Sequence, residues 1–321
     1  MKVRTINKES LPLNAELRVV GARCLLSTNS QEVLSSLARW KAPARGADEP
    51  SFELRVLMDP VAKRERDRVP HFRGLHHLVF AVFGADETIV FDLARRRVSA
   101  VVSDETARDA VFWNTRFLPT ALGLLGATIG VVPLHCACLD RGGEALLLAG
   151  VSGAGKSTLA VALSRLGFSV ISDGWTYVGK DGDQMTAHGI SAPVKLLPDA
   201  VEHFPELRGF KAGVASNGEL AFEVDVAGAF HATVLQQSTP RWVMFLERVA
   251  SQGCEIVPYD NDAAQAFLQN TLERLPVQLQ EATDTRAALV ASLAAKECWL
   301  ARYGGPPQAA AETIARFCER A

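Results

Sequence analysis

The segment GVSGAGKS, from Gly150 to Ser157, fits the pattern G-x-x-x-x-G-K-[ST] in full. Glycines at these positions let the backbone wrap so that several N–H groups point at one phosphate. Lys156 can then reach the β- and γ-phosphates of a nucleotide, and the Ser157 hydroxyl can bind Mg²⁺. The segment therefore predicts a binding site for ATP with Mg²⁺, formed by Gly150, Ser152, Gly153, Ala154, Gly155, Lys156, Ser157 and Thr158.

Asp173 follows the apolar run FSVIS, so it is expected at the carboxyl end of the strand after the loop. Ligands of parallel α/β sheets bind at that end of the strands, which places this carboxylate at the γ-phosphate. There it can take the proton of an acceptor hydroxyl as the new O–P bond forms, or serve as a ligand of Mg²⁺. His135 can hydrogen-bond Asp173 or bind a phosphate oxygen. Alone it would be interpreted as a buried strand histidine, but beside Asp173 and Lys156 we interpret it as catalytic.

Three further charged residues are candidates for contacts with the substrate or the phosphates. Glu247 ends the apolar run RWVMFLE, where a carboxylate can order Mg²⁺ or its water, or can be a surface charge at a strand terminus. Lys195 and Arg208 fall where an acceptor-binding loop is expected, and either can pair with the transferring phosphoryl oxygens. Taken singly, each of these two bases is more simply a solvated surface residue.

The sequence on either side of the loop predicts the strand and the helix that hold it. The run EALLLAGV before the loop is almost wholly apolar, which is typical of a strand buried on both faces. The run STLAVALSRLG after it predicts a helix that ends at Gly167, and the helix N-terminus adds partial positive charge at the phosphates. Strand, loop, helix and strand in this order predict a βαβ unit with a parallel sheet.

The segment LHCACLDRGGEALLLAGVSGAGKSTLAVALSRLGFSVISDG resembles the catalytic core of HPr kinase/phosphorylase and the HPr-kinase-related proteins. The resemblance is specific over residues 134–175 and continues more loosely to RWVMFLER, whereas the first 130 residues match only in general layout. It implies an α/β fold with an HPr kinase/PEP carboxykinase-like P-loop core, and ATP-dependent phosphorylation of a hydroxyl, often that of a serine. In that family the aspartate matching Asp173 is the base toward the acceptor, and the histidine matching His135 lies beside it.

The sequence departs from the family's pattern in two places. Gly174 stands where the family usually has a second aspartate, so we expect weaker binding of Mg²⁺ or a preference for Mn²⁺. The glycine-rich signature of the bifunctional enzymes is reduced to Glu206, Arg208 and Gly209 in PELRGFKAGV. We therefore expect a kinase without phosphorylase activity, acting on an acceptor other than HPr. The resemblance extends to peptide-modifying relatives such as lasso-peptide precursor kinases, which implies a serine of a peptide or protein as acceptor.

Two other functions stay open at this point. One is a small-molecule hydroxyl kinase on the same fold. The other is an NTP-binding regulatory ATPase or switch, which needs a group that activates water and switch loops; no convincing pattern for these occurs. The family's enzymes are often oligomers, so a homo-oligomer is compatible with the resemblance.

Composition indicates a globular protein and argues against a nucleic-acid partner, a disulfide framework and a zinc site. The chain has 321 residues, of which 48% are hydrophobic and 22% charged, so it can bury a sizeable core. A formal net charge of −2 argues against nucleic acid as a partner. Six cysteines in a chain of this length do not make a disulfide framework. Cys136 and Cys138 have no second Cys/His pair at zinc-type spacing, so we expect two buried thiols.

The chain shows no pattern that predicts a membrane protein. Its start lacks an apolar region of signal-peptide length. The run FLPTALGLLGATIGVVPL is long enough to span a bilayer but contains Pro119 and Pro133, so a buried helix followed by a strand is favoured. We expect a cytoplasmic protein with no membrane partner.

Three regions are expected along the chain. Residues 1–130 form a mixed α+β region for substrate or partner binding, with strands in FELRVLM, GLHHLVFAVFG and ETIVFDLARRRVSAVVS and then a helix capped by Ser103. The charged segment 62–68 is expected to be a solvated loop. Residues 131–260 form the P-loop kinase core. Residues 261–321 form a helical segment that packs on the core, with helices in DAAQAFLQNTLERL, DTRAALVASLAAKECWLARYG and PPQAAAETIARFCERA.

Overall fold

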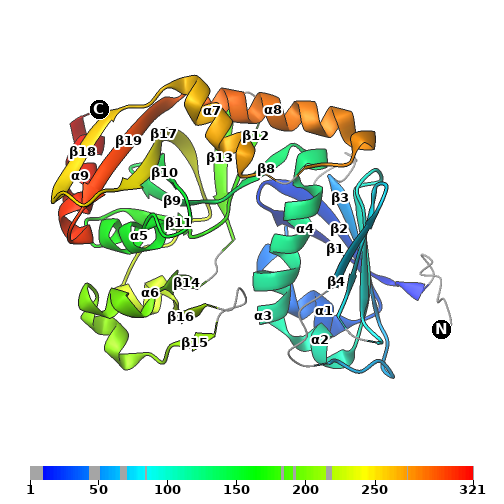
Figure 1. Ribbon diagram of the computed structural model, residues 1–321. Coiled ribbons are helices and arrows are strands. Elements are labelled where there is room, and N and C mark those ends of the chain that lie inside the picture. The colour runs from blue at the N-terminus through cyan, green and yellow to red at the C-terminus, as the bar shows by residue number, and fades with distance from the viewer. Residues whose placement is uncertain are drawn as a thin grey trace. The chain divides into compact units, whose positions relative to one another are not determined.

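The computed structural model of the protein is a mixed α/β structure with several mixed sheets (Figure 1). It describes residues 10–42, 51–65, 71–83, 85–181, 184–190, 193–214, 219–272 and 274–320. The chain forms two compact units, one of residues 1–131 with 274–286 and one of residues 132–273 with 287–321. Each unit has its own sheet.

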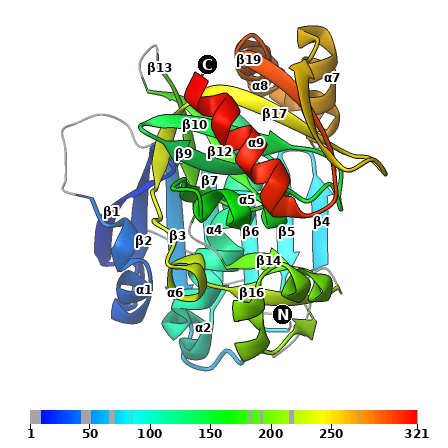
Figure 2. The same ribbon diagram turned by 90° about the vertical axis from the view of Figure 1, so that its left-hand side faces the viewer.

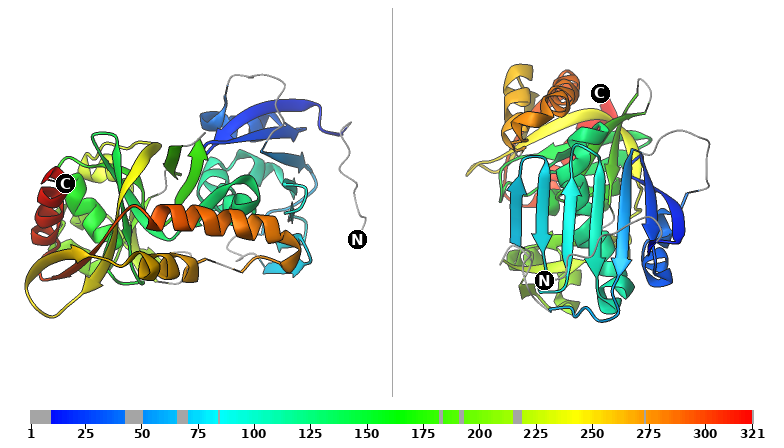
Figure 3. Two further views of the ribbon diagram at one scale, coloured as in Figure 1. Left: turned by 90° about the horizontal axis from the view of Figure 1, so that it is seen from above. Right: turned by 90° about the vertical axis from the view of Figure 1, so that its right-hand side faces the viewer.

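The first unit is built on a seven-stranded sheet in the order β1-β2-β3-β7-β6-β5-β4 (Figure 3, right). Strands β2, β3 and β7 run parallel, and the other neighbours are antiparallel. The alternation expected for FELRVLM is confirmed, because Phe52, Leu54 and Val56 are buried and the residues between them are partly exposed. The strands are β1 Leu13–Val19, β2 Ala22–Thr28, β3 Phe52–Met58, β4 His71–Leu75, β5 Leu78–Val82, β6 Thr88–Asp92 and β7 Arg97–Val102.

Short helices complete this unit. The expected cap is confirmed: the Ser103 side chain accepts a hydrogen bond from the backbone N–H of Thr106, at the start of α2. The apolar run after Arg116 forms the buried helix α4, a short 3₁₀ turn and then strand β8, as expected. Residues 62–65 are coil, and the rest of the charged segment lies outside the described residues. The helices are α1 Gln31–Ser36, η2 Ala38–Trp40, α2 Asp104–Arg108, α3 Ala110–Phe112, η3 Trp113–Phe117, α4 Leu118–Leu125, η4 Gly126–Ile129 and η7 Val277–Leu279.

Nowhere in the described part of the chain is a helix both long and apolar enough to cross a membrane. The longest described helix, α8 (Gln280–Ala294), carries three charged residues in its first half, Glu281, Asp284 and Arg286.

The second unit is built on a nine-stranded mixed sheet, whose main path is β11-β9-β10-β17-β13-β12-β8. The expectation of a parallel sheet is only partly met: β10 pairs parallel with β17, but antiparallel β9 lies between β10 and β11. The cause is local, because Gly142 and Gly143 both have positive φ and form a tight two-residue turn that folds β9 back on β10. The strands are β8 Val131–Leu134, β9 Cys136–Arg141, β10 Glu144–Ala149, β11 Ser169–Ser172, β12 Thr176–Asp181, β13 Gln184–Gly189, β17 Gln237–Arg248, β18 Gly253–Pro258 and β19 Glu297–Gly304.

The C-terminal segment corrects the sequence-based expectation. The helix expected over 284–304 ends at Ala294, and residues Glu297–Gly304 form strand β19 instead. This strand pairs parallel with β17 and antiparallel with β18, so it completes the sheet. Pairing along a long neighbouring strand outweighs the helical preference of the alanine-rich sequence before it. The helices of this part are α7 Asn261–Asn270, α8 Gln280–Ala294 and α9 Pro307–Arg320.

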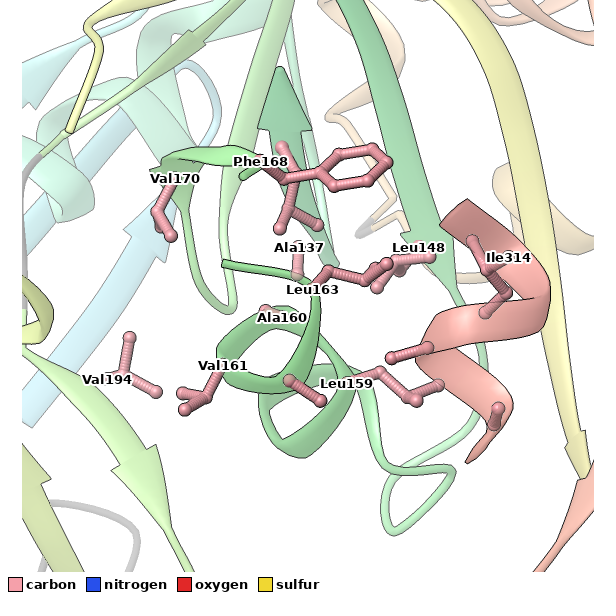
Figure 4. Close-up of a cluster of buried hydrophobic side chains, with 14 of the residues drawn as sticks. Ala137, Leu148, Leu159, Ala160, Val161, Leu163, Phe168, Val170, Val194 and Ile314 are labelled. Carbon is pink, nitrogen blue, oxygen red and sulfur yellow. The ribbon is translucent and has the colours of Figure 1, made fainter. Parts of the chain in front are cut away.

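Apolar side chains cover both faces of this sheet. On one face α5 (Lys156–Ser164) and α9 lie side by side and pack on β9 and β10 (Figures 2 and 4). In Figure 4, Leu159 and Leu163 of α5 lie in one buried cluster with Leu148 of β10 and Ile314 of α9. On the other face, buried residues of α7 and α8 pack on Cys136, Leu147 and Ala149. Burial on both sides explains why β10 is apolar after Glu144, and it holds the loop after β10 on a rigid base.

A small three-stranded sheet lies next along the chain, in the order β14-β16-β15. Short helical turns and the helix α6 accompany it. Its elements are β14 Val194–Leu196, η5 Pro198–Glu202, η6 Pro205–Gly209, β15 Gly213–Val214, β16 Leu220–Val224 and α6 Val226–Phe230.

Candidate nucleotide and phosphoryl-transfer site

The loop of residues 150–155 joins the end of β10 to the start of α5, as the sequence predicts. Gly155 precedes the first residue of α5 and has φ +89°, a conformation that side-chain-bearing residues rarely adopt. A Cβ at this position would also lie 2.1 Å from the hydroxyl of Tyr303. The helix therefore begins at Lys156 with its free N–H groups and its partial positive charge at the loop.

Lys156 lies within this loop, with only 7% of its surface exposed. Its Nζ donates to the carbonyl oxygens of Gly150 at 2.9 Å and Val151 at 3.2 Å. Burial lowers the pKa of its ammonium, and the nearby Asp173 carboxylate partly offsets that effect. An ammonium has three N–H donors, so it can bind a phosphate oxygen in addition to these carbonyls.

Asp173 follows β11 and lies beside the loop, as expected. Its Oδ2 accepts a hydrogen bond from the backbone N–H of Lys195 at 3.3 Å, and the Ser157 hydroxyl lies close to the carboxylate. Its Oδ1 is buried and has no hydrogen-bond partner among the described residues. Burial raises the pKa of this carboxyl to about 6, against the lowering effects of the Ser157 hydroxyl, the Lys195 N–H and the Lys156 charge.

An unpartnered carboxylate oxygen is costly to bury, so its presence beside the loop marks a candidate reactive group. It is suited to accept a proton, because a base with a pKa near 6 is mostly ionised at neutral pH and still basic enough to react. With the Ser157 hydroxyl next to it, the same oxygen also fits a hard cation such as Mg²⁺, although the described residues contain no group of three or more His, Cys, Asp or Glu arranged to hold a metal.

His135 lies between β8 and β9 and is exposed. The first role expected for it is not observed, since the described structure contains no hydrogen bond from His135 to Asp173. Its ring instead lies against Trp175, with 5.4 Å between the ring centroids. Partial burial and the charge of Lys156 lower the pKa of its imidazole. The second role, contact with a phosphate oxygen, stays a prediction.

The three other charged candidates lie on three different elements. Lys195, on β14, contacts Asp173 through its backbone N–H, while its ammonium lies 3.5 Å from Glu223. Arg208 lies on the exposed turn η6. Glu247, near the end of β17, forms an ion pair with Arg302 at 2.9 Å. This pair fits the interpretation of Glu247 as a surface charge at a strand terminus.

Gly174, where the sequence departs from the second aspartate usual in the family it resembles, has φ +90° with open space around it. A carboxylate side chain here would have room but would strain the backbone. Trp175 follows it and is 47% exposed. The Asp173 carboxylate is thus followed by a glycine turn and an exposed aromatic ring.

Sequence reasoning missed Tyr303, which contacts the loop, and Arg248, which packs on Tyr303. The Tyr303 hydroxyl donates to the carbonyl of Ala154 at 2.5 Å, and the Arg248 guanidinium lies 5.3 Å from the centre of the Tyr303 ring. Tyr303 lies on β19, within the segment that was expected to be helical, and no motif links it to residues so far back in the chain. Cys136 and Cys138 are buried in β9, as expected, and burial raises the pKa of the Cys136 thiol to about 12.

Comparisons with known proteins add little to this geometry. No protein-family model matches the sequence, and no curated protein does so. Among solved structures, the chain is similar to one described as the Hpr(Ser) kinase/phosphatase from Coxiella burnetii, with 14% identity over 59% of this chain and 97% of that one. The TM-score is 0.28, a degree of similarity that carries no argument about function.

Proposed function

We propose that this protein is an ATP-dependent kinase that transfers the γ-phosphate to a hydroxyl, and that the acceptor is a serine of a peptide or protein. The observation that carries the proposal is the buried, unpartnered Oδ1 of Asp173 next to Ser157 and Lys156 at a glycine-rich loop. These groups supply a proton acceptor, a hydroxyl ligand for Mg²⁺ and a cation for the phosphates at one site.

In the proposed reaction, the loop amides and Lys156 hold the triphosphate and stabilise the negative charge that develops on the γ-phosphoryl group. The acceptor oxygen bonds to the γ-phosphorus as the bond to the β,γ-bridging oxygen breaks, which leaves ADP. The hydroxyl proton passes to Asp173 and from there to solvent. Mg²⁺, held by Ser157 and the phosphates, would neutralise phosphate charge when bound.

Exposed apolar side chains close in sequence to Asp173 and Lys195 favour a peptide as acceptor. Trp175 lies two residues after Asp173 and is 47% exposed, and Leu197 lies two residues after Lys195 and is 49% exposed. Such side chains cost free energy in water and suit contacts with the apolar side chains that flank a serine in a peptide. A small polar metabolite would gain little from them.

The test offers the purified protein an array of serine- and threonine-containing peptides with [γ-³²P]ATP and Mg²⁺. We expect phosphoserine or phosphothreonine in a subset of peptides, and slow ATP consumption when no acceptor is present. Fast ATP hydrolysis that needs no acceptor and is unchanged in Asp173→Asn would contradict the kinase and support a regulatory ATPase. Transfer to small-molecule hydroxyls alone would retain the kinase and replace the peptide.

The rate of transfer should depend on pH through Asp173. Its carboxyl has a pKa raised to about 6, and only the ionised form accepts the acceptor's proton. We therefore expect kcat/KM for the acceptor to rise tenfold per pH unit below about pH 6 and to level off above it. The measurement is a pH profile at saturating Mg·ATP. A profile that is flat between pH 5 and pH 8 would contradict the role of Asp173 as base.

The glycine at position 174 should make the enzyme dependent on a high concentration of free metal ion. With one carboxylate fewer near the phosphates than the family pattern has, we expect Mn²⁺ to support transfer at a lower concentration than Mg²⁺. We also expect no dephosphorylation of the product by inorganic phosphate. Rapid phosphate-dependent reversal in the wild type would contradict this prediction.

The replacement of Gly174 by aspartate should lower the free energy of unfolding by roughly 1 kcal/mol, because an aspartate at this positive φ is strained. The exposed Gly209→Asp, in ordinary backbone geometry, is the control.

A further inference from the structure

We propose that Tyr303 is a positioning residue that fixes the peptide group between Ala154 and Gly155, and thereby sets the affinity of the loop for the nucleotide phosphates. The inference rests on the proposed function, because it concerns how this loop binds ATP. Tyr303 lies on β19, and the fold brings it next to the loop although no sequence motif connects the two.

The contact is a buried hydrogen bond. Tyr303 is 1% exposed and Ala154 is 4% exposed, and the phenol hydroxyl donates to the Ala154 carbonyl at 2.5 Å. Without the hydroxyl, this carbonyl would be buried with one partner fewer, which is unfavourable. The hydrogen bond therefore favours the one orientation of the peptide group in which its carbonyl faces Tyr303.

The orientation of this peptide group matters for anion binding. The carbonyl of Ala154 and the N–H of Gly155 belong to one planar trans peptide and point in opposite directions. When the carbonyl faces Tyr303, the N–H faces away from it and can be one of the amides that the loop presents to a phosphate. A flipped peptide would present a carbonyl oxygen to the anion and repel it.

Packing around the phenol holds it in this place. Tyr303 and Arg248 are partners in the parallel pairing of β19 with β17, and the guanidinium lies 5.3 Å from the ring centroid. Burial raises the pKa of the phenol, and the positive charge of the nearby guanidinium opposes that shift. On the loop side, a Cβ at Gly155 would lie 2.1 Å from the hydroxyl, so the glycine is the residue that lets the phenol approach.

The experiment compares Tyr303→Phe with Tyr177→Phe, which removes the hydroxyl of another tyrosine that is 1% exposed. Binding of Mg·ATP is measured by calorimetry, basal ATP hydrolysis without acceptor gives KM and kcat, and thermal unfolding gives Tm. We expect Tyr303→Phe to weaken Mg·ATP binding and to raise the KM for ATP by roughly tenfold, the effect of one buried hydrogen bond, with kcat changed by less than about twofold. Its Tm should differ from that of Tyr177→Phe by no more than a few degrees.

A second pair of variants tests the contact itself. Gly155→Ala should bind Mg·ATP poorly, because the new Cβ would meet the hydroxyl at 2.1 Å and because φ +89° strains a residue that has a side chain. Adding Tyr303→Phe removes that oxygen and leaves the ring carbon that carried it 3.4 Å from the Cβ, so the double variant should bind more tightly than Gly155→Ala alone. Binding that is unchanged in Tyr303→Phe, or a double variant no better than Gly155→Ala, would overturn this inference while leaving the proposed function in place. Wild-type protein that fails to bind Mg·ATP would overturn both.

Discussion

Replacing Lys156 with alanine should abolish phosphoryl transfer. Its ammonium is the cation built into the loop, held by the carbonyls of Gly150 and Val151. A positioned donor of this kind is worth on the order of 3 kcal/mol in the transition state, which corresponds to roughly a hundredfold or more in rate. Because the side chain is 7% exposed, its charge acts in a site that is poorly screened by water.

The measurement is transfer to a peptide acceptor at saturating Mg·ATP, with the fold of Lys156→Ala checked by circular dichroism and thermal unfolding. The exposed Lys180→Ala is the matched control, since it removes the same charge from β12 and should keep full activity. Near-normal turnover in a correctly folded Lys156→Ala protein would contradict the assignment of the phosphate loop.

The central part of this site was predictable because its causes are local. The glycines and Lys156 lie within eight consecutive residues, and the apolar runs before and after them predict the strand β10 and the helix α5 that the structure contains. Asp173 could be placed at the end of β11 for the same reason, since the short strand with Val170 and Ile171 at its centre ends just before it. Sequence periodicity is reliable over distances of this length.

What could not be predicted depends on strands that meet from distant parts of the chain. The expected parallel sheet became mixed because a tight glycine turn placed β9 between β10 and β11. The segment that contains Tyr303 was expected to be helical, and only its pairing with β17 and β18 makes it a strand. Such pairing energies depend on neighbours that the local sequence does not reveal. The unpartnered Oδ1 of Asp173 is likewise a consequence of packing and has no sequence signature.

The replacement of Asp173 by asparagine should separate binding from chemistry. Asparagine is nearly isosteric with aspartate but cannot accept the acceptor's proton at this position. We expect Mg·ATP affinity within a few-fold of the wild type and a loss of transfer of roughly 10²–10⁴-fold. Nucleotide affinity and product formation must be measured separately, and the exposed Asp199→Asn is the control for the change of charge. If affinity collapses while the ATP that still binds reacts normally, Asp173 is a ligand of Mg²⁺ and not the base.

Asp173→Asn should also raise the stability of the folded protein, or leave it unchanged, at pH 8. The replacement of a carboxylate that stabilises the fold would lower it. Burial raises the pKa of Asp173 to about 6 in the folded protein, above its value in the unfolded chain. The stability that this shift contributes is complete at low pH and is lost as the pH rises through about 6, because the ionised group is better solvated in the unfolded state. At pH 8 we therefore expect Asp173→Asn to unfold at a temperature equal to or above that of the wild type, with the difference shrinking toward pH 4. A variant that is less stable than the wild type at pH 8 but not at pH 4 would show that the ionised Asp173 stabilises the fold through its charged neighbours. A variant that is stable but inactive would show that the buried charge of Asp173 serves the reaction.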